Sequence, residues 1–266
     1  MKFSSTPESI QTGVEEGTFP NANLQIAVHR GELFLLEANP RASRTLPFVS
    51  KATGVPLARL AVQAMLGQPL PALQSPLPVR DVAVKIPTFS WLKLPGLDTV
   101  LGPEMKSTGE AMGHGASFGT AYRRALAGGS RSLPRSGTVF LSVSNQLKVD
   151  FVDVAQQLAK LGFQLVATRG TAVHLRQAGL EVDTVWRISE GRQPDILSFM
   201  RSGDVDLVIN LPTGRRAQTD GAQMRRLAVE LGIPFITTIT GARAAVEALA
   251  EPGEGDVQPL AAVADF

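Results

Sequence analysis

The chain has no cysteine among its 266 residues. This absence excludes disulfide bonds, zinc fingers and a thiol nucleophile. Histidine is also scarce, and His29, His114 and His174 lie far apart without the spacing of metal ligands. We therefore expect each histidine to lie on the surface or in a turn.

The sequence also lacks strong net charge and long apolar runs. The 26 Lys and Arg residues nearly balance the 24 Asp and Glu residues, which gives a formal charge of +2. Arginine pairs are isolated, so no basic block indicates a nucleic-acid surface. No apolar run reaches the length of a membrane span. The polar start, with Glu8, Glu15 and Glu16, is not typical of a signal or transit peptide, so we expect a cytoplasmic protein without nucleic-acid or membrane partners.

The sequence does have enough apolar residues for two domains. Hydrophobic residues make up 44% and charged residues 19%, as in ordinary globular proteins. Residues 1–22 show no clear period and are expected to be poorly ordered. Apolar runs at 24–29 and 33–38 flank Arg30-Gly31-Glu32, which predicts a β-hairpin.

The most informative motif ends this hairpin and reads Glu37-Ala38-Asn39-Pro40-Arg41. Side chains two residues apart share a face of a strand, so the carboxylate, carboxamide and guanidinium should lie together. Two oxygen ligands followed by a cation suit Mg²⁺ bound to nucleotide phosphates. If the turn is centred on Gly31, Gln25 lies opposite Glu37 as a third metal contact. In the alternative, Asn39-Pro40 simply starts a turn and the arginine is an ordinary surface charge.

The sequence between this hairpin and residue 138 combines helix patterns with a proline-rich stretch. Residues 55–66 have the spacing of an amphipathic helix, and residues 117–127 predict another that ends at two glycines. Residues 68–103 are rich in proline and read as short strands and loops. Residues 130–137 read as a linker, so residues 23–130 are expected to form one segment.

The third segment, 138–250, alternates between strand and helix patterns. Strands are predicted at 139–143, 164–168, 182–188, 205–211 and 234–239, and helices at 150–161, 170–178, 194–202, 220–231 and 241–250. Glycines at 162, 179, 203 and 232 are typical of helix ends. This alternation predicts an α/β fold with a doubly wound parallel sheet, followed by a tail at 251–266.

Polar side chains gather where these predicted strands end. Thr168 and Thr171 bracket a glycine at a strand-to-helix turn, where hydroxyls and a helix N-terminus can hold a phosphate. Lys148 or Arg187 would supply the charge, and Asn210 ends a neighbouring strand. In the alternative, the threonines only cap the helix and the arginine is solvated. No Asp–His or Ser–His pair occurs among the strand ends, which argues against catalysis there.

These segments, in this order, resemble the C-terminal end of the carbamoyl-phosphate synthase large chain, from about Leu24 to about Leu249. The stretches LEANPRASRTLPFVSKATGVP and LGPEMKSTGEAMG resemble the closing strand of its second ATP-grasp module and the segment that follows. The stretches LSVSNQLK, ATRGTA, EGRQPDI and INLPTGRR resemble its methylglyoxal-synthase-like regulatory domain. The resemblance therefore implies a truncated ATP-grasp end followed by a regulatory domain.

The resemblance also implies roles for individual residues in an ATP-dependent, glutamine-hydrolysing ligase. Ligands of a Mg²⁺ or Mn²⁺ ion match Gln25, Glu37 and Asn39, and a residue near the ATP phosphates matches Arg41. Positions that hold a phosphorylated effector, UMP or IMP, match Lys148, Thr168, Thr171, Arg187 and Asn210. Arg187 stands where the family often has lysine. Leu211-Pro212-Thr213 replaces a run richer in hydroxyls, which leaves the identity of the effector open.

An ATP-grasp module needs an upstream lobe, and only about twenty residues precede the hairpin. We therefore expect a fragment, a split gene product or a degenerate paralogue that is inactive alone. The expected partners are the missing N-terminal part of the large chain, the glutamine amidotransferase small subunit and the effector, in arginine and pyrimidine biosynthesis.

Other interpretations stay open beside this one. One alternative is a nucleotide-sensing module without catalysis. A methylglyoxal synthase is disfavoured, because that family uses a catalytic aspartate in a GDQQ-type loop and a later histidine. Residues 191–195 here read GRQPD, and no histidine follows His174. Whether Glu104 and Glu110 contact a ligand or only cap loops is not decided by the sequence.

Overall fold

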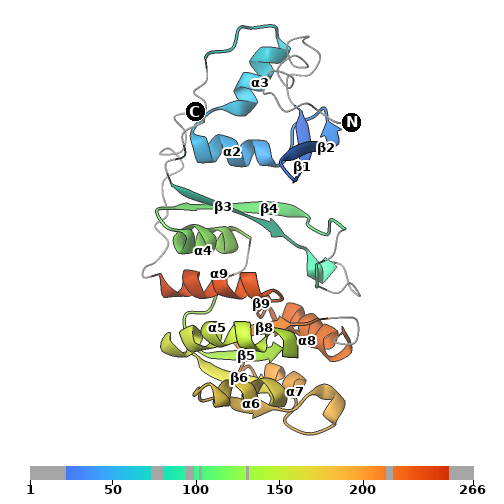
Figure 1. Ribbon diagram of the computed structural model, residues 1–266, viewed down its shortest axis with the longest axis vertical. Coiled ribbons are helices and arrows are strands. Elements are labelled where there is room, and N and C mark those ends of the chain that lie inside the picture. Colours follow the sequence, from blue (N-terminus) through green and yellow to red (C-terminus); the bar gives the residue numbers. More distant parts are fainter. Residues whose placement is uncertain are drawn as a thin grey trace. The chain divides into compact units, whose positions relative to one another are not determined.

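The computed structural model describes residues 22–72, 79, 81–93, 99–101, 104–129, 132–213 and 218–251. The expected disorder of residues 1–22 and the tail after residue 251 fall almost wholly outside these ranges. The chain divides into two compact units with the boundary between Asp81 and Val82, and each unit is described by itself (Figure 1). No helix within the described ranges combines the length and apolar character that a membrane crossing requires.

The first unit contains an antiparallel hairpin and two helices. These elements are β1 (Asn23–His29), β2 (Glu32–Asn39), α2 (Thr45–Thr53) and α3 (Leu57–Met65). The hairpin and α3 are as predicted, whereas the sequence analysis missed α2. That helix contains a proline, and its N-cap residue, Arg44, makes no side-chain capping hydrogen bond. The local sequence therefore carries no helix start signal.

The register of the hairpin is as predicted, but it arises in a different way. The two-residue turn Arg30-Gly31, with positive φ at both residues, would set Gln25 opposite Leu36 in a regular ladder. A β-bulge beside Gln25 leaves Leu36 as the extra residue. Gln25 consequently lies opposite Glu37.

The second unit begins with a second antiparallel pair, β3 (Val82–Thr88) and β4 (Gly109–Gly115). A short 3₁₀ turn, η1 (Trp91–Lys93), follows β3, and α4 (Phe118–Gly128) packs on the pair. The sequence analysis missed β4, because three glycines interrupt the strand pattern. Gly113 allows α4 to pack closely on the strand, because a Cβ atom there would lie 1.8 Å from the carbonyl oxygen of Ala121.

The rest of the second unit is a five-stranded parallel sheet in the order β7-β6-β5-β8-β9. Its strands are β5 (Thr138–Val143), β6 (Gln164–Thr168), β7 (Asp183–Val185), β8 (Leu207–Leu211) and β9 (Phe235–Ile236). Its helices are α5 (Lys148–Lys160), α6 (Arg169–Gln177), α7 (Ile196–Arg201), α8 (Gln218–Leu231) and α9 (Ile239–Ala250). The predicted doubly wound α/β fold is confirmed.

Side chains of β5 alternate between two hydrophobic cores. Val139, Leu141 and Val143 point to one face, where α5, α6 and α9 pack. Phe140 points to the other face, where α7 and α8 pack. Every residue of β8 is buried, as its near-continuous apolar run predicts.

Three predicted strands are shorter in the structure: β8 begins two residues later than predicted, and β7 and β9 end before the predicted residues. After β7, Trp186 forms only an isolated bridge with Asp195, and residues 188–190 turn as a 3₁₀ helix. After β9, Thr238 accepts a hydrogen bond from the Gly241 amide and starts α9 two residues before the predicted helix start. Polar residues at both strand ends favour turns and caps over strand pairing.

The elements β3, β4 and α4 belong to the same compact unit as the parallel sheet. The contact runs through α4 and α9, where a Cβ atom at Gly119 would lie 2.9 Å from the carbonyl oxygen of Glu247. Arg123 Nη1 also donates to the carbonyl oxygen of Glu251 at 3.1 Å. The linker predicted at 130–137 joins elements that pack together, and the assignment of functional domains stays a prediction.

We predict that Gly113→Ala lowers the free energy of unfolding by about 2–3 kcal/mol, because the new methyl group would overlap the α4 backbone. Urea denaturation measures the loss. The control is Gly128→Ala, whose Cβ would lie 3.5 Å from the Ala111 Cβ, and we expect a change below about 1 kcal/mol. Equal stability of the two variants would contradict the packing described.

Candidate functional site

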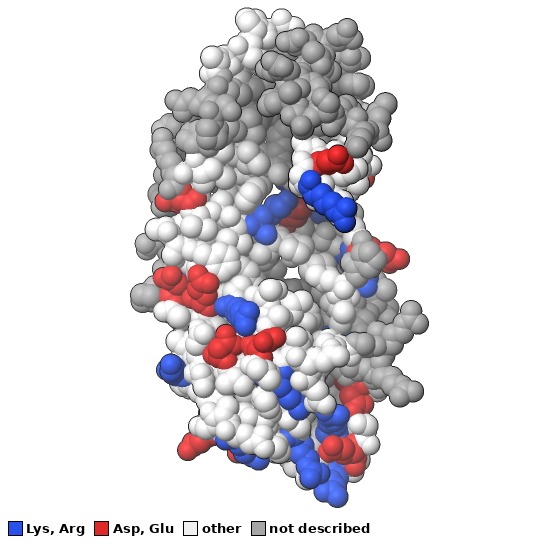
Figure 2. Space-filling model, viewed as in Figure 1, with Lys and Arg blue, Asp and Glu red and all other residues white. Residues whose placement is uncertain are grey.

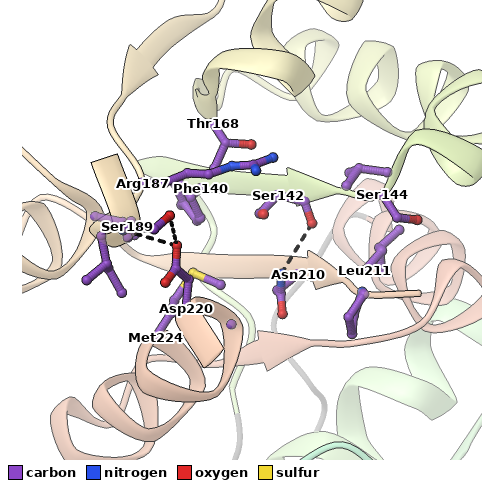
Figure 3. Close-up of a pocket in the computed structure, with 15 residues that line it drawn as sticks. Phe140, Ser142, Ser144, Thr168, Arg187, Ser189, Asn210, Leu211, Asp220 and Met224 are labelled. Carbon is purple, nitrogen blue, oxygen red and sulfur yellow. Dashed lines mark hydrogen bonds between the residues drawn. The ribbon is translucent and has the colours of Figure 1, made fainter. Parts of the chain in front are cut away.

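The topology of the parallel sheet creates a crevice between β5 and β8. The backbone leaves β5 towards β6 and β7 on one side and then returns to β8 and β9 on the other. The loops that follow β5 and β8 therefore diverge, and such a switch point is where doubly wound sheets bind ligands. A cavity of about 250 Å³ lies here, and Figure 3 shows residues from both strand ends pointing into it.

Asn210 lies at the centre of this crevice in a fixed orientation. Its Nδ2 donates to the Ser142 carbonyl oxygen on the neighbouring strand at 3.4 Å. Its Oδ1 accepts from Arg225 Nη1 at 2.5 Å, and Arg225 is only 1% exposed. Gly221 leaves room for that guanidinium, because a Cβ there would lie 2.7 Å from Arg225 Nη1. The sequence analysis did not single out Arg225, and an arginine inside a buried helix face gives no separate signal.

The two predicted threonines are buried and hydrogen-bonded to each other. Thr168 is 4% exposed and Thr171 2%, and their hydroxyl oxygens lie 3.2 Å apart. The Thr171 hydroxyl also accepts from the Val143 amide at 3.1 Å. Thr168 occupies the N-cap position of α6 but makes no side-chain capping bond. The structure therefore does not support the alternative in which the Thr168 hydroxyl only caps the helix.

Two cations lie beside these hydroxyls. Arg187 lines the cavity next to Thr168 (Figure 3). Lys148 Nζ donates to the Gly170 carbonyl oxygen at 2.6 Å, at the start of α6. Burial, and then the positive charge of Arg187, lower the pKa of Lys148. Two close cations at a helix N-terminus favour the binding of an anion.

Two further features of the cavity involve polar side chains, and the sequence analysis missed the first of them, Asp220. Asp220, in the first turn of α8, accepts from the Ser189 hydroxyl at 2.6 Å and from its amide at 3.2 Å. This contact ties the loop after β7 to α8. The Ser144 hydroxyl is buried at the cavity wall without a hydrogen-bond partner in the described ranges. Asp220 is the first residue of the helix predicted at 220–231, and an acidic residue in a first helical turn was the available signal.

The hairpin of the first unit brings the predicted metal ligands together. Asn39 Nδ2 donates to Glu37 Oε1, so both side chains lie on one face, and Gln25 lies opposite Glu37. These three side chains offer one carboxylate and two carboxamides, a set of hard oxygens that fits part of a Mg²⁺ or Mn²⁺ shell. The guanidinium of Arg41 instead donates to the Ala42 carbonyl oxygen at 3.2 Å.

No cluster of three His, Cys, Asp or Glu side chains that suits a metal occurs in the described part of the protein. The metal site on the hairpin, with its single carboxylate, therefore stays a prediction. Of the two carboxylates left open, Glu110 pairs with Lys85 across β3 and β4 at 3.3 Å. It lies within a strand and does not cap a loop.

Two stretches of the sequence match known families. Residues 150–237 match the MGS-like domain, and residues 6–73 match the ATP binding domain of the carbamoyl-phosphate synthase L chain. The second match begins well before Leu24, where the resemblance was expected to start. A solved methylglyoxal synthase from Elizabethkingia anophelis is 24% identical with a TM-score of 0.37, covering 45% of this protein and 81% of that one. At that score it adds nothing to the topology described above.

Several curated relatives are closely similar. A carbamoyl phosphate synthase large chain from Archaeoglobus fulgidus is 50% identical over 85% of this protein and 21% of the relative. The C-terminal sections of the large chains from Methanopyrus kandleri and Methanocaldococcus jannaschii are 48% and 47% identical, covering 82% and 88% of this protein and 42% and 40% of the relatives. The protein thus spans between about a fifth and two fifths of the length of these relatives.

We predict a pH dependence of stability that comes from Lys148. Its pKa is lowered from 10.5, so the folded unit releases this proton at a lower pH than the unfolded state. Between the two pKa values the unfolded state binds more protons, and the contribution of Lys148 to the free energy of unfolding rises with pH. Urea denaturation between about pH 8 and 10 measures the slope.

Lys148→Met should remove this rise, and Lys160→Met, at the other end of α5, should keep it. An unchanged slope in Lys148→Met would show that this lysine is not the perturbed group.

Proposed function

We propose that this protein, which resembles the C-terminal part of the carbamoyl phosphate synthase large chain, binds a phosphorylated effector at the sheet switch point. The resemblance predicted from the motifs is confirmed by both family matches and by relatives 47–50% identical. Because the protein spans less than half of these relatives, the activity, substrates and partners below are proposals.

The observation that carries the effector site is the convergence of Thr168, Arg187 and Asn210 on one cavity. The amides of the first turn of α6 and the cations of Lys148 and Arg187 suit a phosphate. The remaining volume between β5 and β8 suits a ribose and base, which favours a nucleoside monophosphate such as UMP or IMP.

The geometry favours binding over catalysis in this cavity. The loop at 191–195 corresponds to the catalytic loop of a methylglyoxal synthase. Arg192 follows its glycine where GDQQ has the aspartate, and the carboxylate of this loop is Asp195. This carboxylate accepts from the Ser198 amide at 2.8 Å as the N-cap of α7, and it does not line the cavity. A carboxylate committed to a helix cap is poorly placed as a base.

We further propose that the hairpin completes an ATP-grasp site supplied by the remainder of a large chain. Gln25, Glu37 and Asn39 would hold the Mg²⁺ or Mn²⁺, and Arg41 would turn to the ATP phosphates. The bound metal would neutralise charge on the phosphoryl group that is transferred. The reaction is that of a glutamine-hydrolysing ligase with an amidotransferase small subunit, in the cytoplasm, for arginine and pyrimidine biosynthesis.

A second candidate function is a nucleotide sensor without catalysis. The observation in its favour is that the described lining residues of the cavity all belong to the second unit, between Phe140 and Met224. Effector binding would then need nothing from the hairpin.

We predict that UMP or IMP stabilises the protein against heat. At a concentration about 100 times its Kd, the nucleotide adds about 2.7 kcal/mol, or roughly 5–10 °C in Tm for a unit of this size. Thr168→Ala should lose most of this shift and Thr168→Ser should retain it. Differential scanning calorimetry measures both.

The matched control is Thr240→Ala, which removes a hydroxyl on α9 outside the cavity and should leave the shift intact. A full shift in Thr168→Ala, or none in the parent protein with either nucleotide, would contradict the proposed site.

We predict that Glu37→Gln abolishes ATP-dependent synthesis once the protein is combined with the missing part of a large chain and a small subunit. Loss of the one carboxylate among the three proposed hairpin ligands should lower kcat by at least about 100-fold. The control is Glu32→Gln, which changes a carboxylate at the turn end of the same strand, about 16 Å away. Equal activity of the two variants would rule out the metal role of Glu37.

A further inference from the structure

A second cavity lies in the second unit, and none of its described lining residues lines the first cavity. It has a volume of about 340 Å³ and lies between residues 89–93, after β3, and the region where α8 ends and β9 begins. The first cavity lies at the carboxyl ends of the strands, whereas this one borders Phe235, the first residue of β9. The two cavities therefore open at different ends of the parallel sheet.

One wall of this cavity is an ordered aromatic pair. Phe89 and Trp91 stack with ring centroids 4.7 Å apart and planes inclined by 11°. Trp91 is only 7% exposed, so most of its ring packs against other parts of the protein. A preformed aromatic wall is typical of sites for flat or apolar ligands.

The indole of Trp91 also carries an unused donor. Its Nε1–H is buried and makes no hydrogen bond with any residue in the described ranges. Buried donors in native proteins almost always have a partner, because an unpaired one loses the hydrogen bond it makes to water. An acceptor brought by a ligand in the adjoining cavity would satisfy it.

The other walls define the class of ligand. Val229, Ile233 and Pro234 supply apolar surface opposite the aromatic pair, and Lys93 places a cation at the exposed side. A ring with a carboxylate matches both features, because the ring covers the apolar wall while the oxygens accept from Trp91 and face Lys93. The volume lies in the range of about 300–1,000 Å³ found for small-molecule sites.

We propose that this cavity binds a small aromatic carboxylate, separately from the nucleotide. The ring packs against Phe89–Trp91 and the α8 end, and a small movement of the indole on binding lets a carboxylate oxygen accept a hydrogen bond from Trp91 Nε1. Lys93 contributes charge at the opening. The site depends on neither Thr168 nor Arg187, so nucleotide and carboxylate can be bound together.

The two tryptophans allow a direct test with the full-length protein. Uniform ¹⁵N labelling of tryptophan gives two indole N–H resonances, and Trp186→Phe leaves that of Trp91 alone. The probe is 2-naphthoate. We expect saturable movement of the Trp91 resonance and none of the Trp186 resonance, with or without UMP. A Trp91 resonance that does not move up to the solubility limit of the probe overturns the proposal.

Three changes separate this site from general hydrophobic binding. Val229→Trp fills the cavity from a half-buried position on α8 and should abolish the movement. Lys93→Gln should weaken 2-naphthoate about three- to fivefold while leaving neutral 2-naphthamide unchanged. Trp91→Phe should weaken 2-naphthoate at least about tenfold by calorimetry. Retained binding in Val229→Trp, or equal affinity of acid and amide in the parent protein, would overturn the proposal.

Discussion

Parallel pairing of β5 with β8 sets Ser142 beside Asn210, and the backbone leaves these two strands on opposite sides. The candidate effector site follows from this constraint. The hydrogen bond from Asn210 to the Ser142 carbonyl joins the strands at the point where their loops separate. Arg187 lines the resulting crevice on one side, and residues of α8 line it on the other (Figure 3). A different strand order would scatter the same residues along the sheet edge.

Charge is distributed unevenly around this crevice. Arg225 is buried and directs its guanidinium at Asn210, which fixes the amide. A buried guanidinium is retained only where hydrogen bonds replace its water, so Arg225 belongs to the framework of the site. Lys148 differs, because burial and then the positive charge of Arg187 raise the free energy of its charged form and lower its pKa. That arrangement is costly without an anion and favourable with one.

Basic side chains also appear in Figure 2 among mixed charges, without one dominant basic face in that view.

The sequence predicted the elements whose patterns are local and missed those that depend on packing. The apolar run of β8 and the helix-ending glycines marked the parallel sheet to within a few residues. The strand β4 was missed because glycine has a low strand propensity. The glycines at 113 and 115 are there because they let α4 approach the strand closely. The bulge at Leu36 left no signal, although the pairing of Gln25 with Glu37 was predicted correctly. The strand-end position of Thr168 was enough to predict it as a candidate site residue. The contact of Arg225 with Asn210 could be recognised only from the fold.

The fold leads us to infer that a phosphomonoester binds where α6 begins and β8 ends. The decisive measurement is amide NMR of the full-length protein during a titration with UMP. We expect saturable shifts concentrated at the backbone amides of residues 169–171 and at the side-chain amide of Asn210, with the hairpin amides of residues 23–39 unchanged. Shifts confined to the hairpin, or none at millimolar UMP and IMP, would contradict it.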